Sequence, residues 1–273
     1  MKKLMIVGGD SYTDPNFGIY KKFNISPWPT HLAKLNNYDM INTATGGSSN
    51  RHIFNSVVDA IIDNQHREII VVAAWSELYR LSFIDDVDLD STIWLFSDKE
   101  HKFRCTLSEG LKKYFTRIDP LRKEYIKLIK DKCINQKEFD SKLISQSFKN
   151  IWLLQDFCKN RNIPMYHFHT YDPLAYDYSL SAQMYGDVEK SLYENIYLTY
   201  VEKDVNYVGH DYCLYNDIEK NKYFIKNGDI TNLHANQEGH IHIAEKISKF
   251  IKDGLRPESN IEEHGELYRI IRK

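Results

Sequence analysis

The chain has 273 residues, of which 42% are hydrophobic and 27% are charged. This size and composition favour one large domain, or a domain with sizeable insertions, and they exclude an intrinsically disordered chain. The 36 lysines and arginines nearly balance the 38 acidic residues, which gives a formal net charge of −2. The broad positive surface of a dedicated nucleic-acid-binding protein is therefore not expected.

Cysteine usage and the amino terminus bear on the compartment. The four cysteines stand far apart and form no CxxC pair, which argues against a zinc ribbon and favours a reducing compartment. The first apolar run covers only residues 4–7, shorter than the roughly seven residues that a signal peptide needs. No stretch approaches the roughly 18 apolar residues of a membrane span. We expect a soluble, cytoplasmic protein without a membrane partner.

The first 80 residues alternate between strand and helix signals. In chain order we predict a strand at 4–7, a helix at 31–35, a strand at 38–42, a helix that begins near 50 and a strand at 68–74. Short links between such elements give right-handed βαβ units and a parallel sheet. Ligands of such sheets lie beyond the carboxyl ends of the strands. Small polar residues collect at all three of these ends, in residues 9–11, 44–50 and 75–77.

Beyond residue 80 the pattern is interrupted twice. Residues 85–135 are charged and irregular and are predicted to be an insertion, followed by a long helix at 136–161 and a strand at 165–170. Residues 171–228 are predicted to be a second insertion, rich in tyrosine. Tyrosine rings suit the binding of sugars or aromatic ligands, although codon bias is the simpler explanation. A last helix is predicted from Gln237 to Gly254, so the domain spans 1–255 and a charged tail spans 256–273.

Three polar segments are candidates for chemistry. Ser11 follows a buried strand and can act as a nucleophile, although Gly-Asp-Ser is also a common turn composition. Gly47 follows the second strand, where its N–H can stabilise an oxyanion, and a phosphate-binding turn would have the same composition. His234 precedes the last helix and can serve as general base to Ser11. A lone histidine in a loop usually has no such role.

Taken together and in this order, the three segments resemble the SGNH (GDSL-like) hydrolase superfamily. Residues 9–11 match its first block, residues 42–47 (Asn-x-Ala-x-x-Gly) its second and residues 234–240 (His-x-Asn-x-x-Gly-His) its last. The resemblance covers about residues 1–80 and 225–255, and it extends loosely to phage and bacterial members. It implies an α/β fold, a flavodoxin-like three-layer α/β/α sandwich with a mostly parallel sheet. It also implies that Ser11 is the nucleophile, Gly47 an oxyanion donor and His234 the base.

The sequence departs from the family pattern in its third block, which normally reads Gly-x-Asn-Asp. Here the block reads Ala74-Trp75-Ser76-Glu77, so Ser76 stands where an asparagine donates to the oxyanion. A hydroxyl can donate in its place, although it is shorter. Arg80 is either a substrate anchor or an ion-pair partner of Glu77. The residues that we expect to support the site are Asp10, Asn50, Trp75, Glu77 and Arg80.

A second departure concerns the acid that orients the histidine. The family has aspartate three residues before the catalytic histidine, where this sequence has Thr231, and Asp229 lies five residues before His234. The extra residues can form a bulge that still brings Asp229 to the imidazole, which we favour. Alternatively Asn232 or a backbone carbonyl orients His234, and the site is a dyad.

No cofactor or metal is expected. His167 and His169 share one face of a predicted strand, but no carboxylate or cysteine motif accompanies them. The sequence has no Walker A motif and no GxGxxG.

The resemblance implies a serine ester hydrolase that deacylates a small or carbohydrate ester through an acyl-enzyme. Three alternatives stay open: a degenerate SGNH-like module that binds without turnover, an acyltransferase that uses the same site, and a phosphate-binding protein. An extracellular glycan substrate would fit a virion-associated phage protein better than a cytoplasmic one. The sequence sets no oligomeric state.

Overall fold

A computed structural model describes the protein over residues 2–78, 80–83, 91–94, 136–171, 195–209, 212–227 and 230–258. The insertion predicted at 85–135 lies outside these residues except for 91–94, and so does the tail beyond Glu258. Two short strands, β4 (Arg80–Phe83) and β5 (Ser91–Trp94), pair antiparallel with one another in this region.

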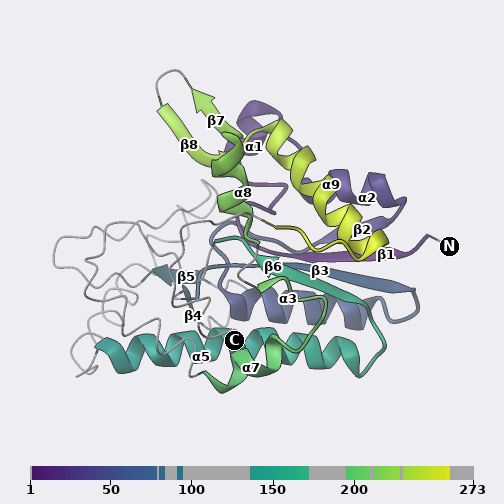
Figure 1. Ribbon diagram of the computed structural model, residues 1–273, viewed down its shortest axis with the longest axis vertical. Helices are drawn as coiled ribbons and strands as arrows, with labels where there is room; N and C mark the ends of the chain where they lie inside the picture. The colour runs from purple at the N-terminus through teal and green to yellow at the C-terminus, as the bar shows by residue number, and fades with distance from the viewer. Residues whose placement is uncertain are drawn as a thin grey trace.

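A parallel sheet forms the centre of the molecule (Figure 1). Its described strands are β1 (Leu4–Gly8), β2 (Asp39–Asn42), β3 (Ile69–Trp75) and β6 (Met165–His169). They lie in the order β2-β1-β3-β6, and every neighbouring pair is parallel. This order, with the first strand inside the second, is that of flavodoxin-like sheets. The predicted fold class is confirmed.

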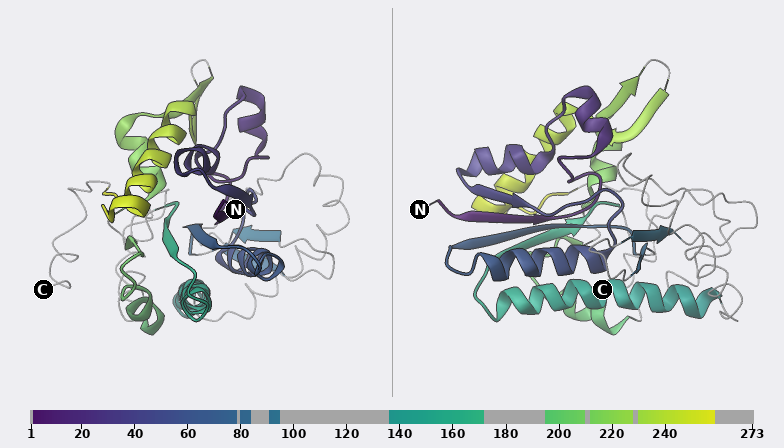
Figure 2. Two further views of the ribbon diagram at one scale, coloured as in Figure 1. Left: turned by 90° about the vertical axis from the view of Figure 1, so that its right-hand side faces the viewer. Right: turned by 180° about the vertical axis from the view of Figure 1, so that it is seen from behind.

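Helices cover both faces of the sheet, as Figure 2 shows. They are α2 (Trp28–Asn36) and α9 (Gln237–Asp253) on one face, and α3 (Asn50–Asp63) and α5 (Gln136–Lys159) on the other. Successive side chains of a strand point to opposite faces. Met5 and Val7 accordingly pack in the cluster with α2 and α9, whereas Leu4 and Ile6 pack in the cluster with α3 and α5. The three-layer arrangement follows from this alternation.

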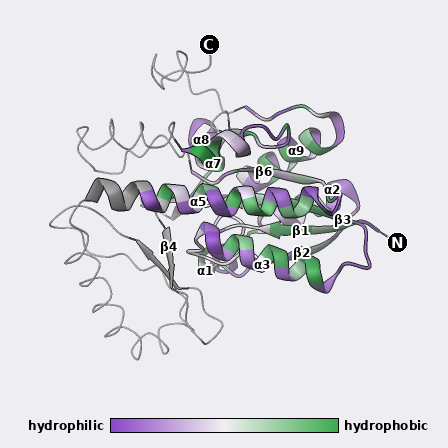
Figure 3. Cartoon of the chain, turned by 90° about the horizontal axis from the view of Figure 1, so that it is seen from below, coloured by the Kyte–Doolittle hydropathy of each residue, from purple (hydrophilic) through white to green (hydrophobic). Residues whose placement is uncertain are grey.

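The hydropathy of α3 and α5 agrees with their position against one face of the sheet. Figure 3 shows hydrophobic residues recurring along α3 and α5 between hydrophilic ones. In α3 the fully buried members Ile53, Val57 and Ile61 are spaced by four residues, which places them on one face of a helix. Within the described residues, no helix has both the length and the hydropathy needed to cross a bilayer.

Part of the predicted second insertion belongs to the core. The backbone of residues 206–209 and 212–215 runs beside β6, where Val208 N–H donates to the carbonyl of His167 (3.0 Å) and Tyr215 N–H to that of Thr170 (2.9 Å). Tyr207 and Tyr212 are completely buried. The flanking elements are α7 (Ile196–Val201), α8 (Leu214–Asn221) and the hairpin of β7 (Phe224–Asn227) with β8 (Ile230–Ala235). Some tyrosines of the predicted second insertion are therefore part of the core, whereas others, such as Tyr200, are exposed.

Polar side chains and a glycine define the ends of α3 and α9. Ser49 caps α3 by accepting from His52 N–H (3.2 Å), and Asn236 caps α9 by accepting from Gly239 N–H (2.8 Å). Gly254 ends α9 in the left-handed region with φ +69°. The helix α1 (Gly18–Phe23) was not predicted, because it has six residues and only one of them, Tyr20, is buried. The helices α7 and α8 were not predicted either, within the second insertion.

His240, in α9, connects this helix to α2. Its Nδ1 accepts a hydrogen bond from Trp28 N–H (3.2 Å), and its ring meets the edge of Tyr20 at 4.7 Å. The imidazole is completely buried, and this burial lowers its pKa to about 3. The neutral form is therefore required for the contact between α9 and α2.

We predict that this residue makes the fold sensitive to acid. The folded pKa lies below the unfolded value of about 6.5, so the unfolded chain binds the proton first and stability falls as pH drops from 6.5 toward 3. Between pH 7 and pH 5 the loss attributable to His240 is about 2 kcal/mol. Urea unfolding of the parent and His240→Asn at both pH values measures it. The asparagine amide keeps an acceptor for Trp28 N–H and does not titrate, so an equal pH dependence in both proteins would contradict this assignment.

Candidate active site

The two ends of the sequence meet at the carboxyl edge of the sheet. Ser11 lies in the turn that follows β1, and His234 lies near the end of β8, 223 positions later. His234 Nε2 is 3.0 Å from Ser11 Oγ. A hydroxyl at this distance from an imidazole nitrogen is within reach for proton transfer. The structure thus brings together the predicted nucleophile and the predicted base.

His234 stands on a strand, in a β-bulge, and not in the loop that the sequence suggested. Phe224 pairs with Ala235 and Ile225 pairs with Asn232, so Leu233 and His234 are two additional residues in β8. Bulges bend a strand and re-aim its side chains. The bulge includes His234 itself, and the prediction that it brings Asp229 to the imidazole stays a prediction. Asp229 lies outside the described residues. Asn232 belongs to β8, and the position of its side chain is not among the described features.

Asp10 joins the ends of three strands. Its carboxylate is completely buried and accepts hydrogen bonds from Tyr12 N–H (3.1 Å), Ser76 Oγ (3.1 Å) and Thr170 Oγ1 (3.4 Å). These donors belong to the segments after β1, β3 and β6. A buried carboxylate needs such donors to offset its lost hydration. The carboxylate therefore holds the turn that carries Ser11 against the rest of the sheet edge.

The position of Ser76 differs from the expectation that its hydroxyl donates to an oxyanion. A hydroxyl has one proton to donate, and that of Ser76 is directed at Asp10, because a carboxylate only accepts. The residue is also 1% exposed. In this arrangement Ser76 is a partner of Asp10 and leaves no proton for a substrate oxygen.

Two backbone N–H groups, in the turns that follow β1 and β2, are without a protein acceptor among the described residues. Within the described part of the chain, neither Ser11 N–H nor Gly47 N–H donates to a protein acceptor. Gly47 has φ +87°, a conformation that glycine adopts without strain. The preceding Gly46 N–H donates to Asp14 Oδ2 (2.9 Å), and Asp14 Oδ1 also accepts from Asn16 N–H. Burial raises the pKa of this Asp14 carboxyl. Asp14 thus fixes the turn just before Gly47.

Asn50 connects this turn to the end of β3. Its side chain exchanges two hydrogen bonds with the backbone of Ser76: Oδ1 accepts from Ser76 N–H (2.8 Å) and Nδ2 donates to Ser76 carbonyl (3.2 Å). Asn50 and Ser76 are both 1% exposed. The amide therefore replaces a pair of backbone hydrogen bonds where β3 ends.

Three other residues were predicted to support the site: Trp75, Glu77 and Arg80. Trp75 is completely buried in the α3 and α5 cluster, where its indole N–H donates to His167 Nδ1 (3.1 Å), so it does not face Ser11. Glu77 is 9% exposed, just after β3. Arg80 begins β4, and its side chain is outside the description.

Several residues of the site carried no clear sequence signal. Asp14 and Thr170 act through contacts that join distant segments. Asn42 was noted only as a motif position, yet its Nδ2 donates to the carbonyl of Thr13 (2.8 Å) and its Oδ1 accepts from Ala44 N–H (3.0 Å). Three aromatic rings also surround His234. A polar residue close to Gly-Asp-Ser was the one available hint for Asp14.

The strand histidines are structural partners of other side chains. His167 Nδ1 accepts from Trp75, and His167 Nε2 lies 3.6 Å from Asp204. Desolvation lowers the pKa of this completely buried imidazole. His169 Nε2 is 2.7 Å from Tyr207 Oη. Among the described residues, no group of three histidine, cysteine or acidic side chains is arranged to hold a metal ion.

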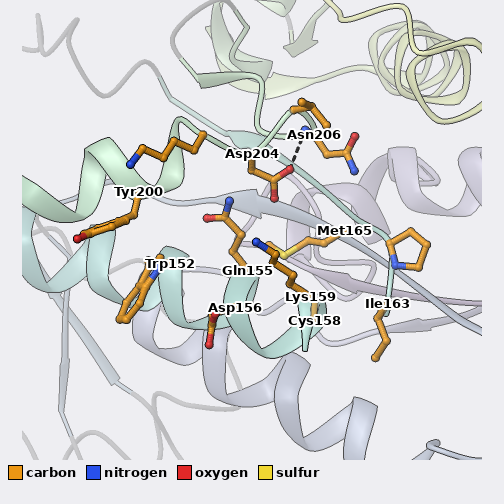
Figure 4. Close-up of a pocket in the computed structure, with 13 residues that line it drawn as sticks. Trp152, Gln155, Asp156, Cys158, Lys159, Ile163, Met165, Tyr200, Asp204 and Asn206 are labelled. Atoms are coloured by element: carbon orange, nitrogen blue, oxygen red, sulfur yellow. Dashed lines mark hydrogen bonds between the residues drawn. The ribbon is translucent and has the colours of Figure 1, made fainter. Parts of the chain in front are cut away.

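A cavity of about 420 Å³ lies elsewhere, between α5 and residues 200–206 (Figure 4). Its lining includes Trp152, Gln155, Met165 and Asp204. Met165 is the first residue of β6, so this cavity is at the amino end of the sheet, away from the edge that carries Ser11. Lys203 lies over the ring of Tyr200, one of its aromatic side chains. The cavity is separate from the candidate active site.

The structure predicts a large effect of the Asn50 amide on stability. Asn50→Ala leaves Ser76 N–H and carbonyl buried without partners, and each such group costs about 1–3 kcal/mol. We expect the free energy of unfolding to fall by about 2–4 kcal/mol, measured by urea denaturation. The matched control is Asn55→Ala on the same helix, which should change stability by less than about 0.5 kcal/mol. Equal effects of the two substitutions would refute this role.

Comparisons with known proteins give distant structural likenesses. No family model and no curated protein matches the sequence. Among solved structures the chain is similar to a psychrotrophic esterase from Pseudoalteromonas sp. (11% identity, TM-score 0.46, 94% of this chain and 100% of that one). It is also similar to a GDSL-like lipase from Bacteroides thetaiotaomicron (11%, 0.41, 93% and 89%). A third is an acetyl xylan esterase from Butyrivibrio proteoclasticus (10%, 0.40, 93% and 64%).

Proposed function

We propose that the protein is a serine ester hydrolase that uses Ser11 and His234. The observation that carries this proposal is the 3.0 Å distance between His234 Nε2 and Ser11 Oγ. The distance joins residues from opposite ends of the chain, on the sheet edge where parallel α/β folds bind ligands. The SGNH-like pattern of residues 9–11, 42–47 and 234–240 supports the same roles.

The proposed reaction has two steps. In the first, His234 Nε2 takes the proton of Ser11 as Oγ attacks the ester carbonyl, and it then gives this proton to the departing alcohol. In the second, His234 takes a proton from water, which attacks the acyl-enzyme and releases the carboxylic acid while Ser11 regains its proton. No other reactant is consumed.

Two N–H groups are the proposed oxyanion donors, those of Ser11 and Gly47. Neither has a protein acceptor among the described residues, and each belongs to a turn that a buried carboxylate fixes, through Asp10 and Asp14 respectively. Donors fixed in advance stabilise the developing charge without reorganisation. Ser76 is not part of this proposal, because its proton goes to Asp10. Asp229 remains the proposed acid, with Asn232 as the alternative.

A fluorophosphonate probe tests the nucleophile directly. We expect one adduct in the intact mass of the parent protein, and no adduct in Ser11→Ala or His234→Ala, because both the hydroxyl and its base are required. His66→Ala, on an exposed histidine, is the matched control and should react like the parent. A folded parent without an adduct, or an undiminished adduct in Ser11→Ala, would overturn the proposal.

The proposed substrate is a small or carbohydrate ester. The half-buried ring of Tyr171 motivates this choice, because it packs edge-on at 5.5 Å against Tyr12, the buried ring that stacks on His234, and a tyrosine ring provides flat amphipathic surface for sugars. We expect measurable turnover of p-nitrophenyl acetate and of acetylated xylo-oligosaccharides. Turnover of p-nitrophenyl palmitate that exceeds that of the acetate would contradict this substrate class.

One alternative has a specific observation in its favour. Because Ser76 donates to Asp10, the site lacks the side-chain donor of the family's third block, as a module that binds without turnover would. Such a module gives no adduct with the probe but binds in glycan arrays. An acyltransferase would give the adduct, and added sugar would convert hydrolysis products into acylated sugar.

A further inference from the structure

His234 is surrounded by aromatic rings from one segment of the chain. The ring of Tyr12 is stacked on the imidazole at 4.8 Å with an interplanar angle of 28°, and the ring of Phe17 lies at 4.6 Å with an angle of 35°. Tyr20 meets the imidazole edge-on at 5.9 Å and 81°. All three residues follow Ser11 by at most nine positions. The segment that carries the nucleophile thus also encloses the base.

The first two rings contact the imidazole independently of one another. Tyr12 is stacked on it and Phe17 is tilted against it, both with ring centroids at less than 5 Å. Both residues belong to the described part of the chain, and no ring contact joins them to one another. Two separate ring contacts at this distance restrict rotation of the imidazole, whose Nε2 lies 3.0 Å from Ser11 Oγ.

Phe17 has a second contact, with the turn that carries the proposed oxyanion donor. A Cβ atom built on Gly46 would lie 2.9 Å from Phe17 Cδ2, so the backbone of Gly46 packs directly against this ring. Phe17 N–H also donates to the carbonyl of Asp14 (3.3 Å), whose side chain accepts from Gly46 N–H. One phenyl ring therefore separates the imidazole from the 46–47 turn and contacts both.

We propose that Phe17 is a positioning residue that sets the imidazole of His234 and the 46–47 turn in register with Ser11. The proposal rests on the ester hydrolase function above, and it assigns to Phe17 no contact with the reacting atoms. Proton transfer requires Nε2 within about 2.6–3.2 Å of Oγ, and small displacements of a catalytic group reduce rates by large factors. A side chain without a flat ring leaves the imidazole face open and allows it to rotate.

The test compares Phe17→Leu, Phe17→Tyr and the parent on p-nitrophenyl acetate. Leucine keeps the apolar volume but not the ring, and we expect kcat to fall at least tenfold while KM changes less than threefold. The rate of fluorophosphonate labelling of Ser11 should fall in parallel. Phe17→Tyr restores a ring and should return kcat to within about threefold of the parent. Phe17 is only half-buried, and thermal unfolding of each variant verifies that it is folded.

The matched control is Phe23→Leu, the same chemical change at the end of α1 on a residue without a ring contact to His234 among the described residues. It should keep the kcat of the parent. Two outcomes overturn the positioning role alone: unchanged kcat and labelling in Phe17→Leu, or an equal loss in Phe23→Leu. A parent that is not labelled at Ser11 overturns the function and this inference together, so the two failures are distinguishable.

Discussion

The buried carboxylate of Asp10 is the interaction on which the site depends. It accepts hydrogen bonds from the segments after β1, β3 and β6 together. Each isolated strand end would place its side chains independently, whereas a shared acceptor sets three of them relative to one another. Burying this charge without donors would cost several kcal/mol, so the donors and the carboxylate require each other. The Ser11 turn is held by the same network.

The base reaches this edge by a different route. His234 comes from the β7–β8 hairpin, outside the parallel sheet, and a bulge of two residues turns its side chain. The hairpin is fixed to α9 directly afterwards, where Asn236 caps the helix and Gly239 packs so closely on Tyr223 that a Cβ would lie 2.8 Å from it. The pattern His-x-Asn-x-x-Gly-His thus combines His234, for which we propose a chemical role, with three residues that determine how the chain enters α9.

The centre of the sheet was predictable from sequence, because β1 and β3 are buried on both faces and appear as unbroken apolar runs. The runs at residues 4–7 and 68–74 match β1 and β3 closely. The places of Ser11, Gly47 and His234 in the chain were also predictable, since they follow β1, follow β2 and precede α9 respectively, whereas their chemical roles stay proposals. The orientation of Ser76 was not, because it depends on Asp10, 66 positions away. Likewise α1 has no periodic pattern, and the pairing of residues 206–209 and 212–215 with the β6 segment depends on long-range contacts.

Ser76, at the end of β3, is surrounded by groups that bind its backbone and its hydroxyl. Asn50 supplies the amide at the end of β3, but both of its polar atoms are bound to the Ser76 backbone, and the Ser76 proton is bound to Asp10. The polar side chains at this point therefore stabilise the backbone and do not face a substrate. In a measured protease, one oxyanion donor contributes about 2.7–4 kcal/mol. In the proposed mechanism the remaining two N–H groups and the imidazole must then be held more firmly, and Asp14, the 46–47 turn and Phe17 provide that rigidity.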